Sequence, residues 1–407
     1  MKAQIEKLFN LSLAKKRRII GLMSGTSMDG LDIVLCKMEG VGLSTKVEVE
    51  NFKTIPYEVD FKNTLKTIFA NPEANLEDVT LLNAWIARKH AGLVLDTLSD
   101  WGIKAKEIDL IASHGQTIFH SPANQHLMAD FPNATLQIGD GDHLAVLTDI
   151  ITLSDFRQKH IAAGGEGAPL AVYGDYLLFS EKAENRILLN IGGISNFTYL
   201  PGNLQANEVF STDVGPGNTL MDQYVFKYFN GLAFDKDAKI AKTGKPDFNL
   251  LEELLNFEFF NRPIPKTTGP EVFNIAYLKR AQERSNTQNL KPEDVLCTLC
   301  HFTAEAIKMA IESISSLKLA INSNERFECV VYASGGGIHN PLLMELLQSK
   351  LQQIKLVDFK NLGILPDAKE AVLFAVLANE TIAGEGTLFE NNQGVPSVCM
   401  GKISLPK

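Results

Sequence analysis

The sequence predicts an α/β protein of two domains, built from two halves that begin in the same way. Apolar, β-rich runs alternate with longer amphipathic stretches along the chain, which is typical of this class. The runs RIIGLMSGTSMDGLDIVL at 18–35 and RILLNIGGISNFTYL at 186–200 share a basic residue, an apolar strand, a glycine-rich turn and a second strand. We interpret this similarity as an internal duplication of the fold. The 407 residues suffice for two domains of ordinary size.

The elements follow from periodicity and from turn residues. In the first half we expect strands at 18–23, 31–38, 47–55, 109–112, 135–138 and 150–153, and helices at 59–69, 76–100 and 143–148. In the second half we expect strands at 186–190, 196–200, 208–210, 328–332 and 355–359, and helices at 219–229, 292–315, from Pro341, and 369–383. The expected domains are residues 1–150, joined by the tail at about 385–407, and residues 151–384, with a helical insertion at about 230–290.

Composition excludes several classes of protein. The net charge is −9, and the only basic run, Lys15 to Arg18, precedes an apolar strand, so we expect neither a nucleic acid nor a membrane as partner. The five cysteines show no disulfide or zinc-ligand spacing, and Cys297 and Cys300 fall within an expected core helix. With no signal peptide and no apolar run long enough to span a bilayer, a cytoplasmic location is expected.

The strongest local signal is the segment GLMSGTSMDGLD at 21–32. Glycine lets the backbone approach a phosphate closely, successive N–H groups form an anion-binding concavity, and the hydroxyls add donors. Loops of the P-loop and Rossmann types open a helix, whereas this loop runs into a second strand. A hydroxyl-rich β-turn-β loop in each half indicates an actin-like kinase architecture, and an ordinary hairpin turn is the alternative.

Three further glycine loops are each open to two interpretations. Gly192 and Gly193 lie at the equivalent place in the second half and could form a phosphate loop or a simple hairpin. In DVGPGN at 213–218, Asp213 is placed as a base at the end of a strand, or else Asp213 or Asn218 caps the next helix. The three glycines at 335–337 leave room for adenine or permit tight packing between strand and helix.

Arg157 and His114 are the remaining candidates. Arg157 precedes a flexible loop, GGEGAP at 164–169, and could clamp a carboxylate-bearing substrate through two hydrogen bonds or form a structural ion pair at a domain connection. His114 follows a strand, in SHGQT, where it could serve chemistry or act as a hydrogen-bonded structural residue.

Taken together, these segments resemble one family along residues 18–383. GLMSGTSMDGLD, SHGQT, TLQIGDGD, SDFR with GGEGAPL, LLNIGGISN, DVGPGN, PKTTG with EVFN, and SGGGIHNPLL occur in the order expected for anhydro-N-acetylmuramic acid kinases. The resemblance implies two ribonuclease H-like domains of the actin/hexokinase/Hsp70 type, with the active site in a cleft between them. It also implies that ATP phosphorylates O6 of 1,6-anhydro-N-acetylmuramic acid while water opens the ring at C1, giving N-acetylmuramic acid 6-phosphate and ADP in cell-wall recycling.

The resemblance and the loop chemistry together give expected roles for single residues. Asp213 is the expected general base, and Asp29 is expected to hold Mg²⁺, through water or directly. The residues expected to bind ATP are Gly25, Thr26, Ser27, Met28, Asp29, Gly30, Leu31, Asp32, Gly192, Gly193, Gly335, Gly336 and Gly337. Those expected to bind the sugar are Arg157, His114, Gly167, Asn218 and Glu370.

Three positions depart from the pattern of this family. His160 stands where an Asp is expected, Pro270 where a basic residue is expected, and Val214 where Thr is commoner. These departures concern the sugar contacts rather than the phosphate loop. A kinase for another sugar, or a nucleotide-binding switch ATPase, remains an alternative on the same fold. The oligomeric state is left open, with a homodimer among the expected assemblies.

Overall fold

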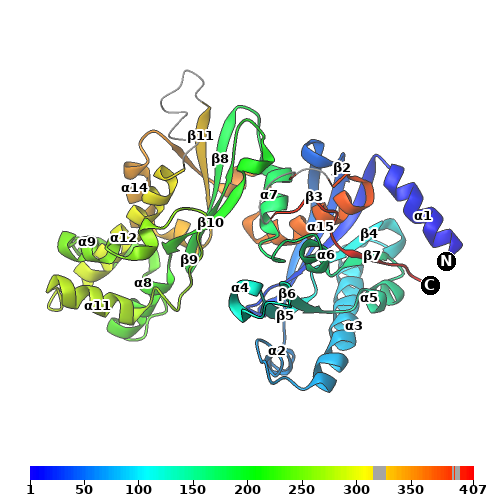
Figure 1. Ribbon diagram of the computed structural model, residues 1–407, viewed down its shortest axis with the longest axis horizontal. Helices are drawn as coiled ribbons and strands as arrows, with labels where there is room; N and C mark the ends of the chain where they lie inside the picture. The colour runs from blue at the N-terminus through cyan, green and yellow to red at the C-terminus, as the bar shows by residue number, and fades with distance from the viewer. Residues whose placement is uncertain (315–326, 387–388, 390–394) are drawn as a thin grey trace. The chain divides into compact units, whose positions relative to one another are not determined.

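The first sheet of the computed structural model has six strands in the order β13-β7-β4-β1-β2-β3 (Figure 1). Three strands, β1 (Lys16–Ser24), β2 (Gly30–Glu39) and β3 (Lys46–Pro56), form an antiparallel meander. Two more, β4 (Leu110–Ser113) and β7 (Ile151–Ser154), run parallel to β1, and β13 (Lys402–Ser404) closes the other edge. The structure describes residues 1–314, 327–386, 389 and 395–407.

The second sheet repeats this topology. Its order is β10-β9-β8-β11-β12, in which β8 (Glu184–Ile191), β9 (Ile194–Leu200) and β10 (Phe210–Pro216) are antiparallel neighbours. Strands β11 (Glu328–Ser334) and β12 (Lys355–Asp358) run parallel to β8. Each sheet thus has a meander followed by two parallel strands, which supports the duplication inferred from the sequence. A separate hairpin pairs β5 (Gln116–Ser121) with β6 (Ala134–Ile138).

The helices lie close to their expected positions. The first group comprises α1 (Lys2–Leu13), α2 (Val59–Lys66), α3 (Leu76–Asp100), α4 (Ala123–His126), α5 (Gly141–Thr148), α6 (Phe156–Ala162), α7 (Ala171–Phe179) and α15 (Lys369–Ala383). The second group comprises α8 (Thr219–Tyr228), α9 (Phe248–Leu255), α10 (Glu258–Asn261), α11 (Ile275–Ser285), α12 (Pro292–Glu312) and α14 (Pro341–Lys350). Helices α9 to α11 occupy the stretch that the sequence identifies as an insertion.

Contacts divide the chain into two units. The first unit comprises Met1–Phe179, Ala206–Glu208 and Asp367–Lys407, and the second comprises Ser180–Gln205 and Val209–Pro366. This division differs from the expected boundaries at 150 and 384. Strand β7 pairs with β4, and α15 packs on β1 and β2, so both belong to the first unit. The tail does join the first unit, through β13.

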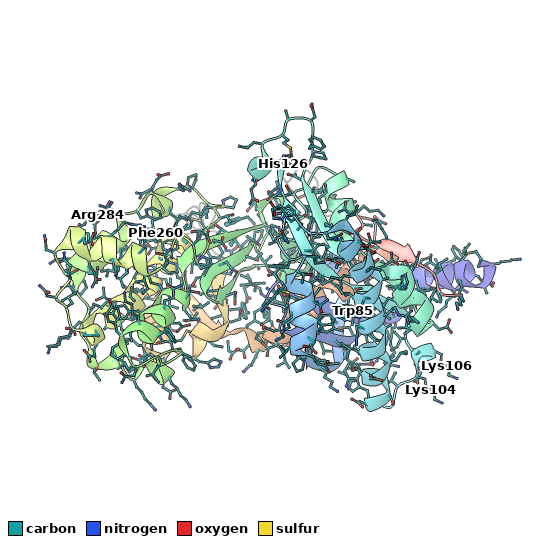
Figure 2. The ribbon with its side chains drawn as sticks, turned by 90° about the horizontal axis from the view of Figure 1, so that it is seen from below. Trp85, Lys104, Lys106, His126, Phe260 and Arg284 are labelled. Atoms are coloured by element: carbon teal, nitrogen blue, oxygen red, sulfur yellow. The ribbon has the colours of Figure 1, made fainter. Side chains whose placement is uncertain are left out.

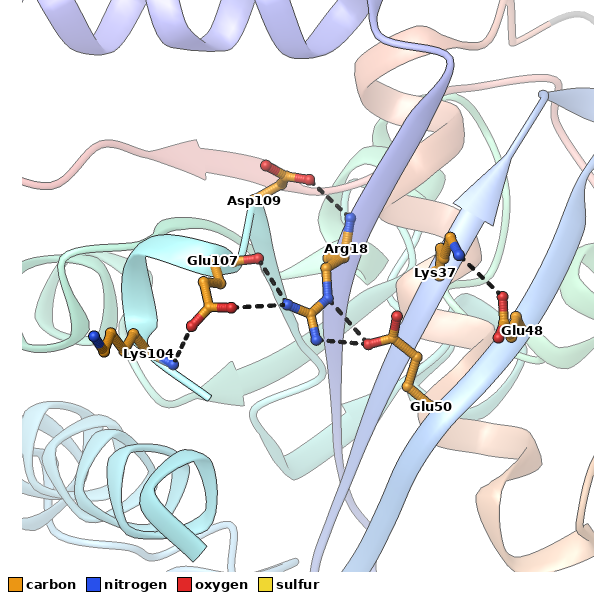
Figure 3. Close-up of polar contacts among 7 residues, drawn as sticks. All are labelled: Arg18, Lys37, Glu48, Glu50, Lys104, Glu107 and Asp109. Atoms are coloured by element: carbon orange, nitrogen blue, oxygen red, sulfur yellow. Dashed lines mark hydrogen bonds and ion pairs between the residues drawn. The ribbon is translucent and has the colours of Figure 1, made fainter. Parts of the chain in front are cut away.

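The basic run at the start of β1 is structural. Arg17 is buried, and its guanidinium donates hydrogen bonds to the carbonyls of Leu11 and Ser12 and to Asn379 Oδ1. Arg18 binds Glu50 at 2.7 Å and also contacts Glu107, while its backbone N–H donates to a carboxylate oxygen of Asp109 (Figure 3). Arg17 and Arg18 are thus held by contacts within the first unit.

Each unit has its own apolar core. Trp85 on α3 stacks on Phe61 in the first unit, with ring centroids 4.9 Å apart, and Phe260 lies edge-to-face with Phe302 in the second. Figure 2 labels Trp85 and Phe260. Cys297 and Cys300 are buried on α12 as free thiols, as the core-helix interpretation requires. Among the described residues, no helix has the length and apolar character needed to cross a bilayer.

Gly21 on β1 brings α15 unusually close. A Cβ built at Gly21 would lie 2.0 Å from the carbonyl oxygen of Ala371, whereas a Cβ at Gly92 on α3 would meet nothing within 4 Å. We predict that Gly21→Ala lowers the free energy of unfolding by about 3 kcal/mol, because overpacking forces the helix off the sheet. Gly92→Ala is the matched control and should raise it by about 0.5–1 kcal/mol. Denaturant titration checks both signs, and equal effects would contradict the packing argument.

Candidate functional site

The glycine loop between β1 and β2 presents polar groups to solvent. Ser24 pairs with Leu31 at the end of the hairpin, and Thr26, Ser27 and Asp29 are exposed. The loop is tied down by two backbone bonds: Met28 N–H donates to the Gly25 carbonyl at 3.2 Å, and Tyr57 N–H donates to the Asp29 carbonyl at 3.0 Å. The hydroxyl donors expected to face an anion are therefore accessible on an anchored loop.

Packing requires glycine at one position of this loop, Gly30, but not at another, Gly25. A Cβ at Gly30 would lie 2.4 Å from the carbonyl oxygen of Ile55, so packing against β3 requires glycine there. A Cβ at Gly25 would meet only the Ser27 hydroxyl, at 3.6 Å, which is an ordinary contact. Neither packing nor a positive φ therefore requires glycine at position 25, and the backbone there has room beside it.

Arg157, at the start of α6, is held by two hydrogen bonds of its guanidinium group. Its Nη1 donates to the Gly167 carbonyl at 2.7 Å, and its Nη2 lies 3.1 Å from His114 Nε2. Its Nε is buried without a hydrogen-bond partner in the described part of the chain. A buried, unsatisfied guanidinium donor is costly, so an anionic or carbonyl ligand at this point would be stabilised.

His114 holds Arg157 rather than reaching outward. His114 Nδ1 lies 3.0 Å from the Ser24 carbonyl, which only accepts, so Nδ1 carries the proton and Nε2 accepts from Arg157. Burial, reinforced by the Arg157 charge, lowers the pKa of His114 to about 3 and keeps the ring neutral. Both ring nitrogens of His114 are therefore occupied within the protein, and the expected sugar-binding role of His114 stays a prediction.

The departure at His160 has a structural explanation. His160 Nδ1 accepts a hydrogen bond from Gly167 N–H at 2.9 Å, and the His160 carbonyl accepts from Gly165 N–H. Burial lowers the pKa of His160 to about 4, so its ring is neutral and able to accept. The neutral imidazole thus holds the glycine loop. Gly167, expected among the sugar ligands, is buried and acts on Arg157 through its carbonyl.

The carboxylates of Glu370 and Asp32 interact electrostatically within the first unit. Desolvation raises the pKa of Glu370 on α15, with Lys369 and Arg157 opposing the rise and Asp32 adding to it. Desolvation also raises the pKa of Asp32, against a hydrogen bond from Thr54. No group of three or more potential metal ligands gathers among the described residues. Mg²⁺ at nucleotide sites uses one or two carboxylates together with phosphate and water, and exposed Asp29 suits that pattern.

In the second unit, the loop at Gly192 and Gly193 is hydrogen-bonded to the DVGPGN segment. Gly217 N–H donates to the Gly193 carbonyl at 2.9 Å, and Asn218 N–H to the Gly192 carbonyl at 2.8 Å. Asn218 Nδ2 donates to the Ile191 carbonyl, and its side chain makes no capping bond to α8. The capping alternative for Asn218 is therefore wrong, and its side-chain amide instead holds the backbone beside the Gly192 turn.

The sequence left two interpretations of the three glycines after β11: tight packing between strand and helix, or room for adenine. A Cβ at Gly335 would clash with the Ile191 carbonyl, and one at Gly337 would clash with the Ile191 side chain. Gly336 is exposed, and its Cβ would meet only Asn218 Nδ2, at 3.4 Å. Packing explains Gly335 and Gly337, while Gly336 leaves an open backbone. A cavity of about 290 Å³ lies close by, lined by Ala333, Ile338, His339, Met344, Gln348, Leu356, Val357 and Asp358.

Asp213 lies within β10, at a bulge between Asp213 and Gly215, and not on a turn after the strand as expected. Its N–H donates to the Lys266 carbonyl, and its Oδ2 accepts from Thr268 N–H, both at 2.9 Å. Desolvation raises the pKa of Asp213, and the Thr268 bond opposes that rise. The carboxylate caps no helix. One oxygen is held by the PKTTG segment, and Oδ1 has no hydrogen-bond partner among the described residues.

These features define the class of protein. Two similar α/β sheets, each with glycine loops, and a carboxylate fixed by a hydrogen bond are typical of a two-domain phosphotransferase. The sequence model of the family described as anhydro-N-acetylmuramic acid kinase matches residues 17–402. A relative of that name from Pseudoalteromonas translucida is 55% identical over 99% of both chains, and one from Caldanaerobacter subterraneus is 36% identical over 98% of this chain and all of its own. A solved hexokinase structure covers 89% of this chain and is covered over 84% of its own length, with a TM-score of 0.40 and 10% identity.

This chain belongs to the anhydro-N-acetylmuramic acid kinase family. Several residues that hold these groups in place were not singled out from the sequence. Tyr57 and His90 carry no motif: Tyr57 bonds to Ser24, and His90 bonds to Tyr57. Thr268, which holds Asp213, falls in the PKTTG segment and could have been found. Gln116 could have been found, because it falls in the SHGQT segment whose His114 was singled out.

Neutral buried histidines make the fold acid-sensitive. Burial lowers the pKa of His90 and His160 to about 4 and that of His114 to about 3, below the ordinary value of about 6.5. Below pH 6.5 the unfolded chain binds these protons and the folded protein does not, so stability is full above that pH and falls toward pH 4. We predict a loss of about 1.4 kcal/mol per histidine between pH 7.5 and 5.5. Urea titration at both pH values measures it.

His90→Gln is the control, since it removes one titrating group and keeps an N–H donor. Between pH 7.5 and 5.5 the free energy of unfolding of this variant should fall by about 1.4 kcal/mol less than that of the natural protein, whatever its absolute stability. A variant with an unchanged pH dependence would show that His90 is not buried in its neutral form.

Proposed function

We propose that this protein is an ATP-dependent kinase that converts 1,6-anhydro-N-acetylmuramic acid and water to N-acetylmuramic acid 6-phosphate and ADP. The observation that carries the proposal is the family match over residues 17–402, supported by relatives of that name along the full length. The γ-phosphoryl group of ATP moves to O6, the bond between O6 and C1 breaks, and water adds its hydroxyl to C1. Use of ATP and a cell-wall sugar fits a place in peptidoglycan recycling in the cytoplasm.

The nucleotide would be held by the glycine loops of both units. A Cβ at Gly25 or at Gly336 would make only ordinary contacts, so a ligand can approach the backbone there, and the Thr26 and Ser27 hydroxyls add donors. Mg²⁺ bound to the phosphates would neutralise charge that builds up during transfer, with Asp29 orienting it directly or through water. Phosphoryl transfer needs mostly positioning and charge neutralisation, which backbone N–H groups on an anchored loop provide.

The sugar would be held in the first unit by Arg157 and Glu370. The unpaired Nε of Arg157 is a donor suited to the carboxylate that distinguishes muramic acid from other amino sugars. His114 and Gly167 keep the guanidinium in one orientation, so little side-chain freedom is lost on binding. Glu370, with its raised pKa, adds a carboxyl group able to bond a sugar hydroxyl.

Asp213 would act as general base. Water is a poor nucleophile at neutral pH and must lose a proton as it attacks C1. Desolvation raises the pKa of Asp213 and so makes it a stronger base, while Thr268 fixes Oδ2 and leaves Oδ1 to accept the proton. Because the base must be ionised, kcat should decline as the pH falls through this raised pKa.

The test of the base is Asp213→Asn, which keeps the shape and removes the proton acceptor. We predict that kcat falls by about 10²–10⁴-fold, while sugar and ATP binding change little. Asp235→Asn is the matched control, because Asp235 accepts two backbone hydrogen bonds at 2.9 Å in the same unit and should affect stability only. An ATPase assay over a panel of sugars, with mass detection of the product, measures both variants.

Near-normal turnover in Asp213→Asn would assign the base to another carboxylate. A joint loss of sugar binding and stability would make Asp213 structural. Turnover of ordinary hexoses in place of the anhydro sugar by the natural protein would overturn the substrate assignment, and ADP release without any sugar would favour a switch ATPase.

Gly25→Val tests the phosphate loop without disturbing the fold. Since a Cβ at Gly25 has room, the free energy of unfolding should stay within about 0.5 kcal/mol of the natural value. The added side chain would keep the phosphates from the backbone N–H groups, and loss of hydrogen bonds to a charged group should weaken ATP affinity by about 10- to 100-fold. Calorimetric titration with an ATP analogue measures this, and unchanged affinity would place the phosphates elsewhere.

A further inference from the structure

A buried chain of hydrogen bonds ends on Ser24, the last residue before the glycine loop. Ser24 is 1% exposed, and its hydroxyl contacts Gln116 Oε1 at 2.6 Å and the Tyr57 hydroxyl at 2.9 Å. Tyr57 in turn lies 2.8 Å from Nε2 of His90, which is buried on α3. Four side chains from four separate segments of the first unit thus meet at the base of the loop.

The direction of every proton in this chain can be worked out. Gln116 Nε2 faces the carbonyls of Gly25 and Thr117, so its Oε1 is the end that accepts from Ser24. The Ser24 hydroxyl proton is therefore used, and the Tyr57 hydroxyl must donate to the Ser24 oxygen. His90, whose burial keeps it neutral, then donates from Nε2 to the Tyr57 oxygen.

A second, independent bond holds the backbone of the same residue. The Ser24 carbonyl accepts from His114 Nδ1, and His114 Nε2 accepts from Arg157. The side chain of Ser24 is thus fixed by the Tyr57 chain, and its backbone is fixed from the Arg157 side. Removing the Tyr57 hydroxyl breaks the first connection and leaves the second intact.

We propose that Tyr57 and His90 are positioning residues for the nucleotide, acting through Ser24 and Gln116 on the Gly25 end of the phosphate loop. This inference rests on the proposed function, in which that loop binds ATP phosphates. Tyr57 acts twice, because its backbone N–H also holds the Asp29 carbonyl at the far end of the loop. Neither residue touches the loop's exposed donors, so their effect is on the placement of those donors.

The experiment compares two tyrosine-to-phenylalanine variants. Tyr57 and Tyr277 are each 7% exposed, and each donates one hydroxyl hydrogen bond, in the case of Tyr277 to the Leu254 carbonyl in the second unit. Tyr57→Phe should weaken ADP affinity by about 3- to 10-fold, which corresponds to the loss of one or two hydrogen bonds. Calorimetric titration with ADP in the absence of sugar measures this affinity. The KM for ATP should rise similarly while the KM for sugar stays within about 2-fold, since the Arg157 connection survives.

Tyr277→Phe should lower thermal stability and leave ADP affinity unchanged. A conservative pair at His90 gives a second test: His90→Gln keeps an N–H donor and should retain affinity, whereas His90→Leu should behave like Tyr57→Phe. Equal ADP affinity in the natural protein, Tyr57→Phe and His90→Leu would overturn the proposal. So would a loss of sugar affinity that matches the loss of ADP affinity.

The readout separates this inference from the proposed function. If the natural protein binds ADP but phosphorylates a different sugar, the substrate assignment fails and the comparison of ADP affinities still applies. If Gly25→Val leaves ADP affinity unchanged while Tyr57→Phe reduces it, the loop is not the phosphate site and this inference falls, whereas the proposed reaction, which rests on the family match, does not.

Discussion

The close packing of α15 on β1 is the constraint on which the site of the first unit depends. The helix can approach only because Gly21 has no side chain, and its carbonyl at Ala371 occupies the space that a Cβ would take. That approach fixes the first turn of α15, which carries Glu370, on the same unit as Arg157 and Asp32. A site assembled from three distant segments therefore depends on one missing methyl group in a central strand.

Burial determines what the histidines of this unit do. Free imidazole titrates near neutral pH and often serves as an acid or a base. Here desolvation lowers the pKa of His90, His114 and His160, so that each ring is a fixed combination of one donor and one acceptor. A neutral ring with one protonated nitrogen fixes the groups on both of its sides. His114 does this by accepting a hydrogen bond from Arg157 and donating one to the Ser24 carbonyl.

The two sheets share one topology but use their first hairpins differently. The hairpin of the first unit ends in an exposed loop with hydroxyl donors, whereas the equivalent loop at Gly192 and Gly193 is bonded to the DVGPGN segment. That bonding, together with a β-bulge, places Asp213 where Thr268 can hold one of its oxygens. Duplication supplied two similar frameworks, and the loops added different chemistry to each.

The sequence by itself determined the local structure and the family. Periodicity located α3 and α15 at their observed bounds, and turn chemistry located the glycine loops, because helix period and turn residues are encoded over a few neighbouring positions. Only the tertiary structure decided that β7 and α15 belong to the first unit, since strand pairing and helix packing join segments far apart in the chain. It also decided which partners His114, Gly167 and Asn218 have within the protein, and that Tyr57 and His90 join a hydrogen-bond chain to Ser24. The physical reason is that a polar group is free or occupied according to its partners in space, which spacing along the chain does not specify.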